Sequence, residues 1–335
     1  MSFKMNQFRD EVVNAVKAIL GESAIVTPIA VTKNNGTALQ GIIVAENHSG
    51  VSPVIYLEKY FEEYCYGKTI AKIAADICMV YRESKLQEVF NVKRVTDFER
   101  IRDRIFYQLI NAEMNEERLK DIPHIRFLDL AVVFRICFGD GDGNLATALV
   151  ENRHTELWGI SLEELYCLAS VNTPVLFPAA CRTIREVLME ELGGQMDIPE
   201  EETGDKDSLY VLTNMMRIFG ASAICYKGQL QRKAENFGTD VLILPSSIHE
   251  TLLLPDHGER IKDLEAMVSE INEAEVALED RLSYHVYRYR RNTGLIEYVN
   301  GEGEMVYADL EDLLENRKGI IKKEAELEHV GGTKI

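Results

Sequence analysis

The sequence lacks the features that mark secreted, membrane-spanning and zinc-binding proteins. Its six cysteines form no C-x-x-C pair, and a structural zinc site needs clustered soft ligands, so we expect no metal. No apolar run approaches the roughly 18 residues of a membrane span, and the charged N-terminus predicts no signal peptide. Scattered free thiols suit a reducing compartment, which predicts a cytoplasmic protein without a membrane association.

The motifs of common catalysts are missing as well. The chain has no G-x-S-x-G, no H-E-x-x-H and no G-x-x-x-x-G-K-[ST]. Those patterns build the nucleophile elbow of serine hydrolases, the zinc helix of metalloproteases and the phosphate loop of nucleotide-binding proteins. We therefore expect no cofactor, and the sequence leans away from an enzyme.

Positive charge is in short supply. Acidic residues outnumber basic ones, 55 against 37, and give the 335-residue chain a formal net charge of -18. Such a charge disfavours long-range attraction to nucleic acids and anionic membranes. A basic strip at Arg288, Arg290 and Arg291, interleaved with tyrosines, is the best local candidate for nucleic-acid binding. An exposed edge strand with protective charges explains the same residues, and we favour that interpretation.

The chain does contain the patterns of helices and strands. Apolar residues recur at helical spacing over residues 6–20, and two extended runs, residues 24–32 and 38–45, flank Asn35 and Gly36. Asn-Gly favours a primed hairpin turn because both central residues must take positive φ. The sequence therefore predicts an opening helix followed by a hairpin.

A glycine-rich loop, residues 139–144, follows a predicted buried strand over residues 128–138. Asp140, Asp142 and Asn144 of this loop, with Glu151 further on, stand at positions 1, 3, 5 and 12 of a calcium-binding helix–loop–helix. The glycine expected at position 6 is a leucine, however, and the flanking runs resemble strands. We therefore favour a plain hairpin loop that leads into a return strand.

More helices and strands are expected in the second half of the chain. Ser161 and Glu164 match a capping box at the start of a helix that Pro174 should end. Residues 179–192 carry the pattern of one amphipathic helix, and residues 220–226 read as a strand. Helices and strands are thus intermixed along the chain.

The stretch DVLILPSSIHETLLLPD, residues 240–256, joins two apolar runs around a Pro-Ser-Ser turn. Its polar residues, with two more distant side chains, form the candidate functional surface. These candidates are Ser246, Ser247, His249, Glu250, His124 and Asp129.

Two interpretations of this stretch stay open. Ser247 and His249 share a face if they lie on a strand, yet such neighbours rarely make the in-line contact of a nucleophile and its base. We favour the interpretation that His249 and Glu250 brace the turn by hydrogen bonds. The alternative is that they line a functional surface.

Several stretches together resemble one protein family. They are SPVIYLEKYFEEYCYGKTIAKIAADI, LINAEMNEERLKDIPHIRFLDLAVVFR, LWGISLEELYCLASVNTP, LYVLTNMMRIFGASAICYKGQL, DVLILPSSIHETLLLPD and DRLSYHVYRY. The chain resembles the bacterial domain of unknown function 5688 family over about residues 6–299. LPSSIHE and PHxRxLDLAVVF are the strongest motifs. The resemblance implies a gene of mostly anaerobic Gram-positive bacteria, often near mobile genetic elements, and it brings no activity, cofactor or catalytic residue.

The sequence predicts an α+β protein with mixed, mostly antiparallel sheets, packed helices and two closely associated lobes. Residues 1–121 form the first lobe, with the Asn-Gly hairpin. Residues 122–300 form the second, with the LDLAVVF and DVLILPSSIHE strands, and residues 301–335 form a charged tail.

The leading functional hypothesis is a non-enzymatic protein-binding or regulatory accessory protein of a mobile genetic element. One alternative is a hydrolase or transferase that uses Ser247, His249 and Glu250. Another is an acidic nucleic-acid mimic that acts against host defence. The partner is expected to be a protein, and the oligomeric state stays open.

Overall fold

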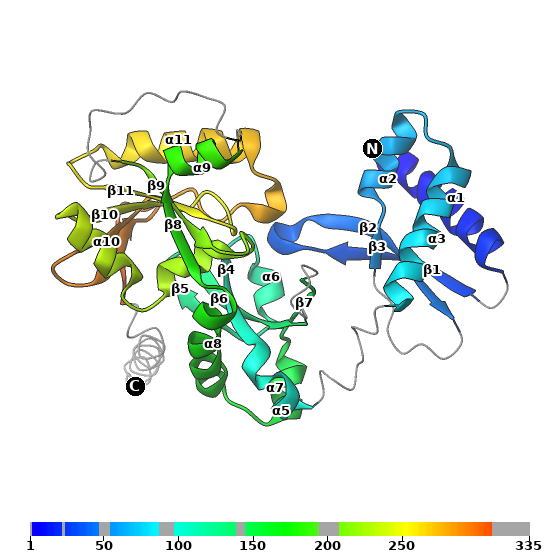
Figure 1. Cartoon of the computed structure of the whole chain (residues 1–335), viewed down its shortest axis with the longest axis horizontal. Helices are drawn as coiled ribbons and strands as arrows, with labels where there is room; N and C mark the ends of the chain where they lie inside the picture. Colours follow the sequence, from blue (N-terminus) through cyan, green and yellow to red (C-terminus); the bar gives the residue numbers. More distant parts are fainter. Residues whose placement is uncertain are drawn as a thin grey trace, which may run out of the picture. The chain divides into compact units, whose positions relative to one another are not determined.

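A computed structural model describes residues 2–21, 24–46, 54–86, 97–138, 145–191, 193 and 208–309. The chain divides into two compact units, Met1–Ile101 (unit 1) and Arg102–Ile335 (unit 2). In both units helices pack on sheets (Figure 1), and every described strand pair is antiparallel. The fold class is α+β, as the sequence predicts.

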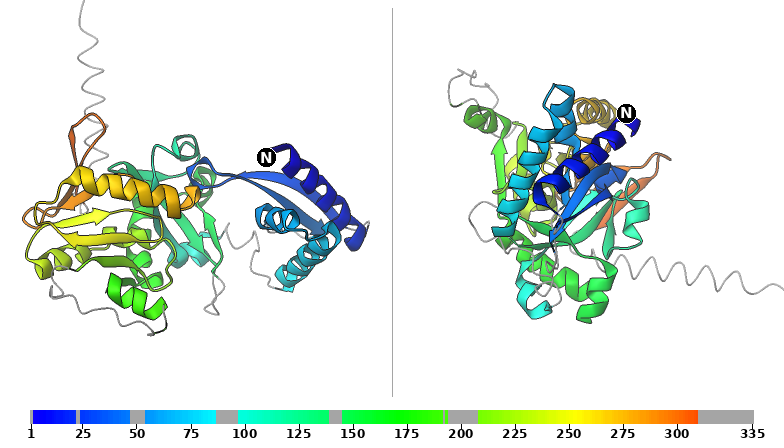
Figure 2. Two further views of the ribbon diagram at one scale, coloured as in Figure 1. Left: turned by 90° about the horizontal axis from the view of Figure 1, so that it is seen from above. Right: turned by 90° about the vertical axis from the view of Figure 1, so that its right-hand side faces the viewer.

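Unit 1 is a three-stranded sheet, in the order β1-β2-β3, with helices on one face. Its elements are α1 (Ser2–Leu20), β1 (Ala24–Thr32), the 3-10 turn η1 (Asn34–Gly36), β2 (Ala38–Glu46), β3 (Val54–Tyr56), α2 (Glu58–Cys65), α3 (Ile70–Leu86) and α5 (Phe98–Ile101). α1 and α3 lie side by side (Figure 2), and their buried stripes meet the inner side of the sheet in a single apolar core. Phe8, Val12, Ile42 and Ile77 are among the core residues that solvent barely reaches.

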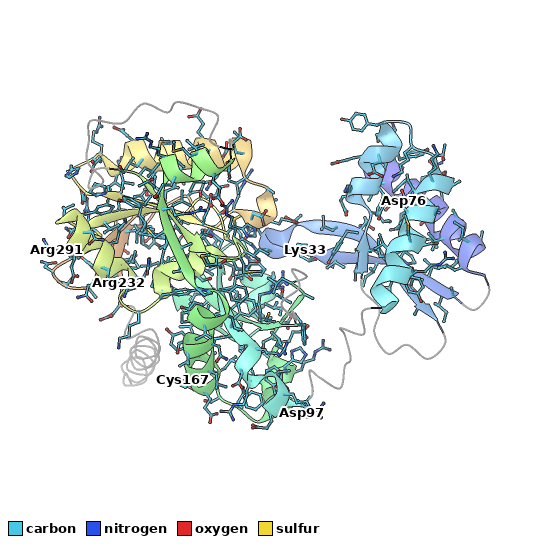
Figure 3. The ribbon with its side chains drawn as sticks, viewed as in Figure 1. Lys33, Asp76, Asp97, Cys167, Arg232 and Arg291 are labelled. Atoms are coloured by element: carbon cyan, nitrogen blue, oxygen red, sulfur yellow. The ribbon has the colours of Figure 1, made fainter. Side chains whose placement is uncertain are left out.

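The β1–β2 hairpin confirms the predicted Asn-Gly turn. Asn35 and Gly36 have positive φ, 55° and 69°, which glycine and asparagine tolerate better than other residues. The connection is longer than a two-residue turn, because the Lys33 N–H bonds to the Thr37 carbonyl oxygen over 2.7 Å. Figure 3 shows Lys33 on this hairpin.

Unit 2 contains a seven-stranded sheet, in the order β14-β13-β12-β10-β11-β9-β8, and a four-stranded sheet in which β6 pairs with β4, β5 and β7. The strands are β4 (Ile105–Asn111), β5 (His124–Phe127), β6 (Leu130–Cys137), β7 (Thr147–Leu149), β8 (Ala179–Thr183), β9 (Tyr210–Asn214), β10 (Val241–Leu244), β11 (Thr251–Pro255), β12 (Tyr287–Tyr289), β13 (Leu295–Val299) and β14 (Met305–Asp309). The helices are η2 (Arg102–Arg104), α6 (Glu116–Leu119), α7 (Asn152–Trp158), α8 (Leu162–Leu176), α9 (Ile184–Glu191), η4 (Gly220–Cys225), α10 (Gln229–Phe237), α11 (Ile261–Glu275) and η5 (Leu278–Asp280).

The units divide after Ile101, whereas the sequence predicted a boundary after residue 121. β4 precedes the predicted boundary and β6 follows it, yet the two strands pair from Ile105↔Ile136 to Asn111↔Leu130. This ladder places the residues just before the predicted boundary in unit 2.

β4 is an edge strand, yet all seven of its residues are buried. Its outward backbone groups therefore need partners other than bulk water. Side-chain hydroxyls from later elements supply them. The Tyr107 N–H donates to Thr173 Oγ1 over 3.0 Å, and the Leu109 N–H donates to Ser222 Oγ over 3.2 Å. Side chains of α8 and η4 thus take the place of a further strand.

Two helix predictions were wrong in part. Residues 179–192 do not form one helix, because Ala179–Thr183 pair with β9 as strand β8. Thr183 and Glu186 then form a capping box that begins α9, with the Glu186 N–H donating to Thr183 Oγ1 over 3.2 Å. α8 continues past Pro174, since a proline near the end of a helix removes only one N–H donor. Among the residues that the structure describes, no helix has both the length and the apolarity to cross a bilayer.

Candidate functional site

The stretch singled out in the sequence forms the middle of the seven-stranded sheet. β10 and β11 pair as the predicted hairpin, from Val241↔Pro255 to Leu244↔Leu252. α11 covers one face of this hairpin (Figure 2). The apolar runs are therefore core, and residues 245–250, which include the candidate polar side chains, form the loop at one end of the hairpin.

His249 has a protein partner for each ring nitrogen. The Phe219 backbone N–H donates to Nδ1 over 3.3 Å, which makes Nδ1 the acceptor nitrogen of the ring. Nε2 then carries the hydrogen and lies 3.3 Å from Asp280 Oδ1. The Phe219 ring stacks on the imidazole, with centroids 6.0 Å apart and planes inclined by 18°. In this arrangement neither nitrogen is left to take a proton from a substrate.

The serines and Glu250 do not complete a catalytic set around this histidine. Ser247 Oγ accepts from the backbone N–H of His249 over 3.1 Å and makes no bond to the ring. The Ser247 backbone pairs with Arg281 in an isolated bridge. Ser246 and Glu250 are half-buried. Ser247 therefore shapes the loop, and the structure brings Ser247 and His249 together through the backbone alone.

η4 approaches the His249 loop at a distance that only glycine allows. A Cβ on Gly220 would lie 2.1 Å from Thr213 Oγ1, 2.4 Å from the His249 carbonyl oxygen and 2.7 Å from the Asn214 nitrogen. Thr213 Oγ1 donates to the same carbonyl oxygen over 2.7 Å. The prediction of a strand over residues 220–226 was wrong, because the chain coils here into η4 and buries its small residues against this loop.

Residues 214–219, between β9 and η4, form a tight turn that we call the methionine turn. The buried Asn214 ties it together, because its Oδ1 accepts from the Met216 N–H over 3.0 Å. Arg217 and Phe219 have positive φ, 53° and 57°. That conformation costs a residue with a side chain roughly 1–2 kcal/mol, so surrounding contacts must hold it.

The methionine turn and α9, which the Arg217 ion pair joins, both carry exposed apolar side chains. They are Leu188 (40% exposed), Met189 (38%), Met215 (69%) and Met216 (44%). Arg217 Nη2 lies 2.6 Å from Glu190 Oε2 and so ties the turn to α9, and Arg182 pairs with the same carboxylate. Exposed apolar side chains and paired charges therefore occur together on these two elements.

Phe219 also joins the two sheets of unit 2. Its ring centre lies 5.0 Å from the guanidinium of Arg135 on β6 and 6.1 Å from the ring centre of Phe106 on β4, and the same ring stacks on His249 of the β10–β11 loop. Burial lowers the pKa of Arg135 to about 10, and the guanidinium donates to Thr147 Oγ1 over 2.7 Å and 3.0 Å. The turn is therefore held from both sheets.

Asp129 is linked to the same loop through one intermediate residue. It lies in the two-residue turn between β5 and β6, where Leu128 has a positive φ of 57°. Its Oδ2 accepts from the Ser283 hydroxyl and its Oδ1 from the Tyr287 hydroxyl, each over 2.6 Å. Burial raises the pKa of Asp129 above its ordinary value, although the two hydrogen bonds oppose the rise. The Ser283 N–H donates to the Pro245 carbonyl oxygen over 3.3 Å, so Asp129 helps to fix the loop.

His124 belongs to a different place. It lines an open pocket of about 340 Å³ together with residues that include Leu119, Lys120 and Asn152. Its Nδ1 lies 3.0 Å from the Ile122 carbonyl oxygen and therefore donates to it. The structure joins five of the six predicted candidates around the β10–β11 loop and leaves His124 apart from them.

The other chemistries weighed in the sequence gain no geometric support. Among the described residues, no group of three or more histidine, cysteine or carboxylate side chains is placed to hold a metal. The possible calcium ligands Asp140, Asp142 and Asn144 lie outside the residues that the structure describes.

The basic strip near the C-terminal end of the sheet is neutralised by acidic neighbours. Arg288 Nε lies 2.5 Å from Asp256 Oδ2, and Arg290 Nη2 lies 2.6 Å from Glu297 Oε1. Arg291 follows directly on this strand end (Figure 3) and donates its backbone N–H to Asp240. These pairs leave little free positive charge for a phosphate backbone.

Sequence reasoning missed the residues that complete this site. Phe219, Gly220 and Asp280 come from segments about 30 residues away from His249. The sequence does contain a weak signal for an exposed methionine turn, since Met215 and Met216 follow a polar Thr-Asn pair rather than an apolar run. Two adjacent methionines at the end of a strand cannot both face the core, because successive strand side chains alternate.

Comparison with known proteins places the chain in a family. Neither the search of curated proteins nor that of solved structures gives a match. The model of a family described as "Family of unknown function (DUF5688)" matches residues 5–291, which include the whole β10–β11 loop and the methionine turn. This match spans most of the chain and agrees with the resemblance of its motifs, and the protein therefore belongs to the DUF5688 family.

Proposed function

We propose that the protein is a non-enzymatic binding protein and that the methionine turn is the surface through which it contacts a partner protein. One observation carries the proposal: a strained turn, braced on two sheets, holds Met215 and Met216 in solvent. Methionine side chains are unbranched and polarizable, so they adapt to varied apolar surfaces. Strain retained in a surface turn is typical of functional sites.

In this proposal the predicted candidate residues act indirectly. His249 accepts from the Phe219 N–H, and Asp129 supports the loop through Ser283. Both contacts fix backbone positions, and neither leaves a reactive group exposed to a substrate. The LPSSIHE stretch then serves as a brace, and the partner touches the turn that it braces.

The hydrolase or transferase alternative has less support. A serine nucleophile needs a base whose ring nitrogen reaches its hydroxyl. Ser247 Oγ bonds the backbone of His249 instead, and the imidazole nitrogens face Phe219 and Asp280. An enzyme would have to rebuild this loop before each reaction.

The test is quantitative capture of partners from the lysate of the native host. The full chain carrying Met215→Glu with Met216→Glu is compared with the wild type, since two charges in place of the exposed methionines of the turn should abolish docking. We expect at least one partner to be depleted about tenfold or more. As a matched control, Met305→Glu on β14 changes a methionine that is 41% exposed and should leave capture unchanged.

The same capture experiment also tests in which biological process the protein acts. We extend the proposal to an accessory or regulatory role in a mobile genetic element, and the family resemblance of the sequence supports this part. A partner encoded by the same element is the expected result. Equal capture of every protein by the wild type and the double variant contradicts the proposed surface.

The acidic-mimic alternative predicts a different pattern, and one observation favours keeping it in the test. Residues 1–101 hold twelve basic and twelve acidic side chains, so the net charge of -18 belongs entirely to residues 102–335. A mimic would capture a DNA-binding protein in a salt-sensitive manner. Such capture would survive the methionine substitutions and would be lost in about 0.5 M salt.

A further inference from the structure

The sheet of unit 1 has an outer face on which none of the strand residues is charged. Its helices cover one face, where Val26, Ile42 and Ile55 enter the core. Cross-strand partners lie on the same face, so the strand register defines the opposite one. The residues of this outer face are Ile25, Thr27, Ile29, Val31, Leu39, Gly41, Ile43, Ala45, Val54 and Tyr56.

Such an uncharged face is unusual for a sheet that has one side exposed to solvent. Antiparallel sheets with one solvated side alternate apolar and polar residues, whereas the outer side of β2 carries Leu39, Gly41, Ile43 and Ala45 and no polar side chain. Ile25 is 57% exposed, and Thr27 beside it is exposed as well. Near the β1–β2 turn, Lys33 Nζ lies 4.1 Å from the centre of the Tyr56 ring and covers that ring. The open part is therefore centred on Ile43.

Charge makes unit 1 the one part of the chain where two copies can meet without net repulsion. Its basic and acidic residues balance, while unit 2 carries the entire net charge of -18. Repulsion between the acidic units falls off within about 8 Å at physiological salt. The strand residues of this face carry no charge to desolvate when it is covered, and the nearby Lys33 lies over the Tyr56 ring at one end of the face.

We propose that a second copy of this chain covers the outer face of unit 1, sheet against sheet, about a twofold axis. Two sheets pack face to face about 10 Å apart when their side chains interdigitate. A Cβ on Gly41 would lie 2.6 Å from Val54 Cγ1, so a side chain of β3 already fills the gap at this glycine, and a twofold axis brings the same apolar face of the two copies together. The inference is independent of the methionine turn, which belongs to unit 2.

The size of the face sets the strength of this dimer. Two strands of nine residues are about 30 Å long and β3, with three residues, is about 10 Å long, so strands about 4.8 Å apart give a footprint of roughly 340 Å². That is less than half of the roughly 800 Å² per partner of a standard stable interface. The dimer should therefore form reversibly and only at micromolar or higher concentrations.

Sedimentation velocity of the full chain tests the proposal. Between about 1 and 300 µM the wild type should shift from monomer to dimer, and more salt should strengthen the dimer because it screens the acidic units. Ile43→Asp should raise the dissociation constant about tenfold or more. Thr27→Glu should do the same, and it alters a side chain that is already exposed, so a folding defect cannot explain its effect. Ile19→Asp on α1, at a residue that is 45% exposed, is the control that should dimerise like the wild type.

Two results overturn the proposal. One is a monomer at every concentration and salt level. The other is a dimer whose dissociation constant is the same in the wild type, Ile43→Asp and Thr27→Glu. Circular dichroism of each variant confirms that the compared chains are folded.

Discussion

The two units keep their structures by different means. Unit 1 surrounds one apolar core, and among its described residues Asn35 is the sole polar side chain that is buried. In unit 2 many polar side chains are buried, and several of them bond the backbone of another element. Examples are Asn111, Thr173, Thr213, Ser222 and Asn272.

This difference indicates which substitutions each unit tolerates. Apolar contacts are not directional, so a core like that of unit 1 tolerates changes that conserve volume. A buried hydrogen bond forms only when its donor and acceptor are correctly placed. Loss of one partner leaves the other unsatisfied, which lowers the free energy of unfolding by about 1–3 kcal/mol. Unit 2 should therefore respond sharply to small substitutions at its polar joints, and unit 1 to loss of volume.

Gly220→Ala is the strongest way to test this contrast. Its Cβ would fall within 2.1–2.7 Å of three atoms, two of them in the backbone, so the loop and η4 must separate. We expect a loss of about 4 kcal/mol in the free energy of unfolding of unit 2. The single tryptophan, Trp158, lies in unit 2, so its fluorescence in a urea titration reports this transition. Gly301→Ala, at a glycine with open space around its Cβ position, is the matched control and should change little.

Ile42→Ala asks the same question of unit 1. Ile42 is fully buried in the apolar core, and removal of three carbon atoms should cost about 3 kcal/mol. Because unit 1 has a core of its own, this loss should lower the stability of unit 1 in circular dichroism while the Trp158 transition stays in place. If the Trp158 transition moves by the same amount, the two units unfold together and the contrast between them breaks down.

Asp129→Asn gives the smallest effect at neutral pH and the clearest dependence on pH. Asparagine keeps one acceptor for the hydroxyls of Ser283 and Tyr287 but carries no charge, so we expect a net change of about 1 kcal/mol. Burial raises the pKa of Asp129 from its ordinary value of 3.8. The contribution of the raised pKa to stability is present below pH 3.8 and is lost as pH rises through the native pKa. The wild type should therefore gain stability relative to Asp129→Asn as the pH falls, and a constant difference in urea titrations from pH 7 to pH 3 would count against the role of burial.

Local patterns predicted the elements whose determinants lie close together in the sequence. The Ser161–Glu164 capping box forms as predicted, with the Glu164 N–H donating to Ser161 Oγ over 3.2 Å. The β10–β11 hairpin also forms, because two apolar runs flank one turn. In both cases the partners are a few residues apart, so propensity and spacing decide the outcome.

Predictions failed where a distant partner decides the local structure. Residues 179–183 have a helical pattern, yet they pair with β9, which begins at Tyr210. Residues 220–226 look like a strand, yet Gly220 must pack on the His249 carbonyl group. The candidate site shows the same limit: sequence spacing joined Ser247 to His249, whereas the ring partners of His249 come from residues 219 and 280.

The hydroxyls that complete β4 have a consequence for the order of folding. The strand ends at Asn111, but its outer N–H groups find their acceptors at Thr173 and Ser222, 66 and 113 residues from their donors. During synthesis this edge therefore stays unsatisfied until about half of unit 2 has left the ribosome. An unpaired strand edge readily pairs with other chains, so the growing chain is most exposed to misassembly in that interval. A substitution that slows the docking of α8 or η4 should lower the yield of folded protein more than it lowers the final stability.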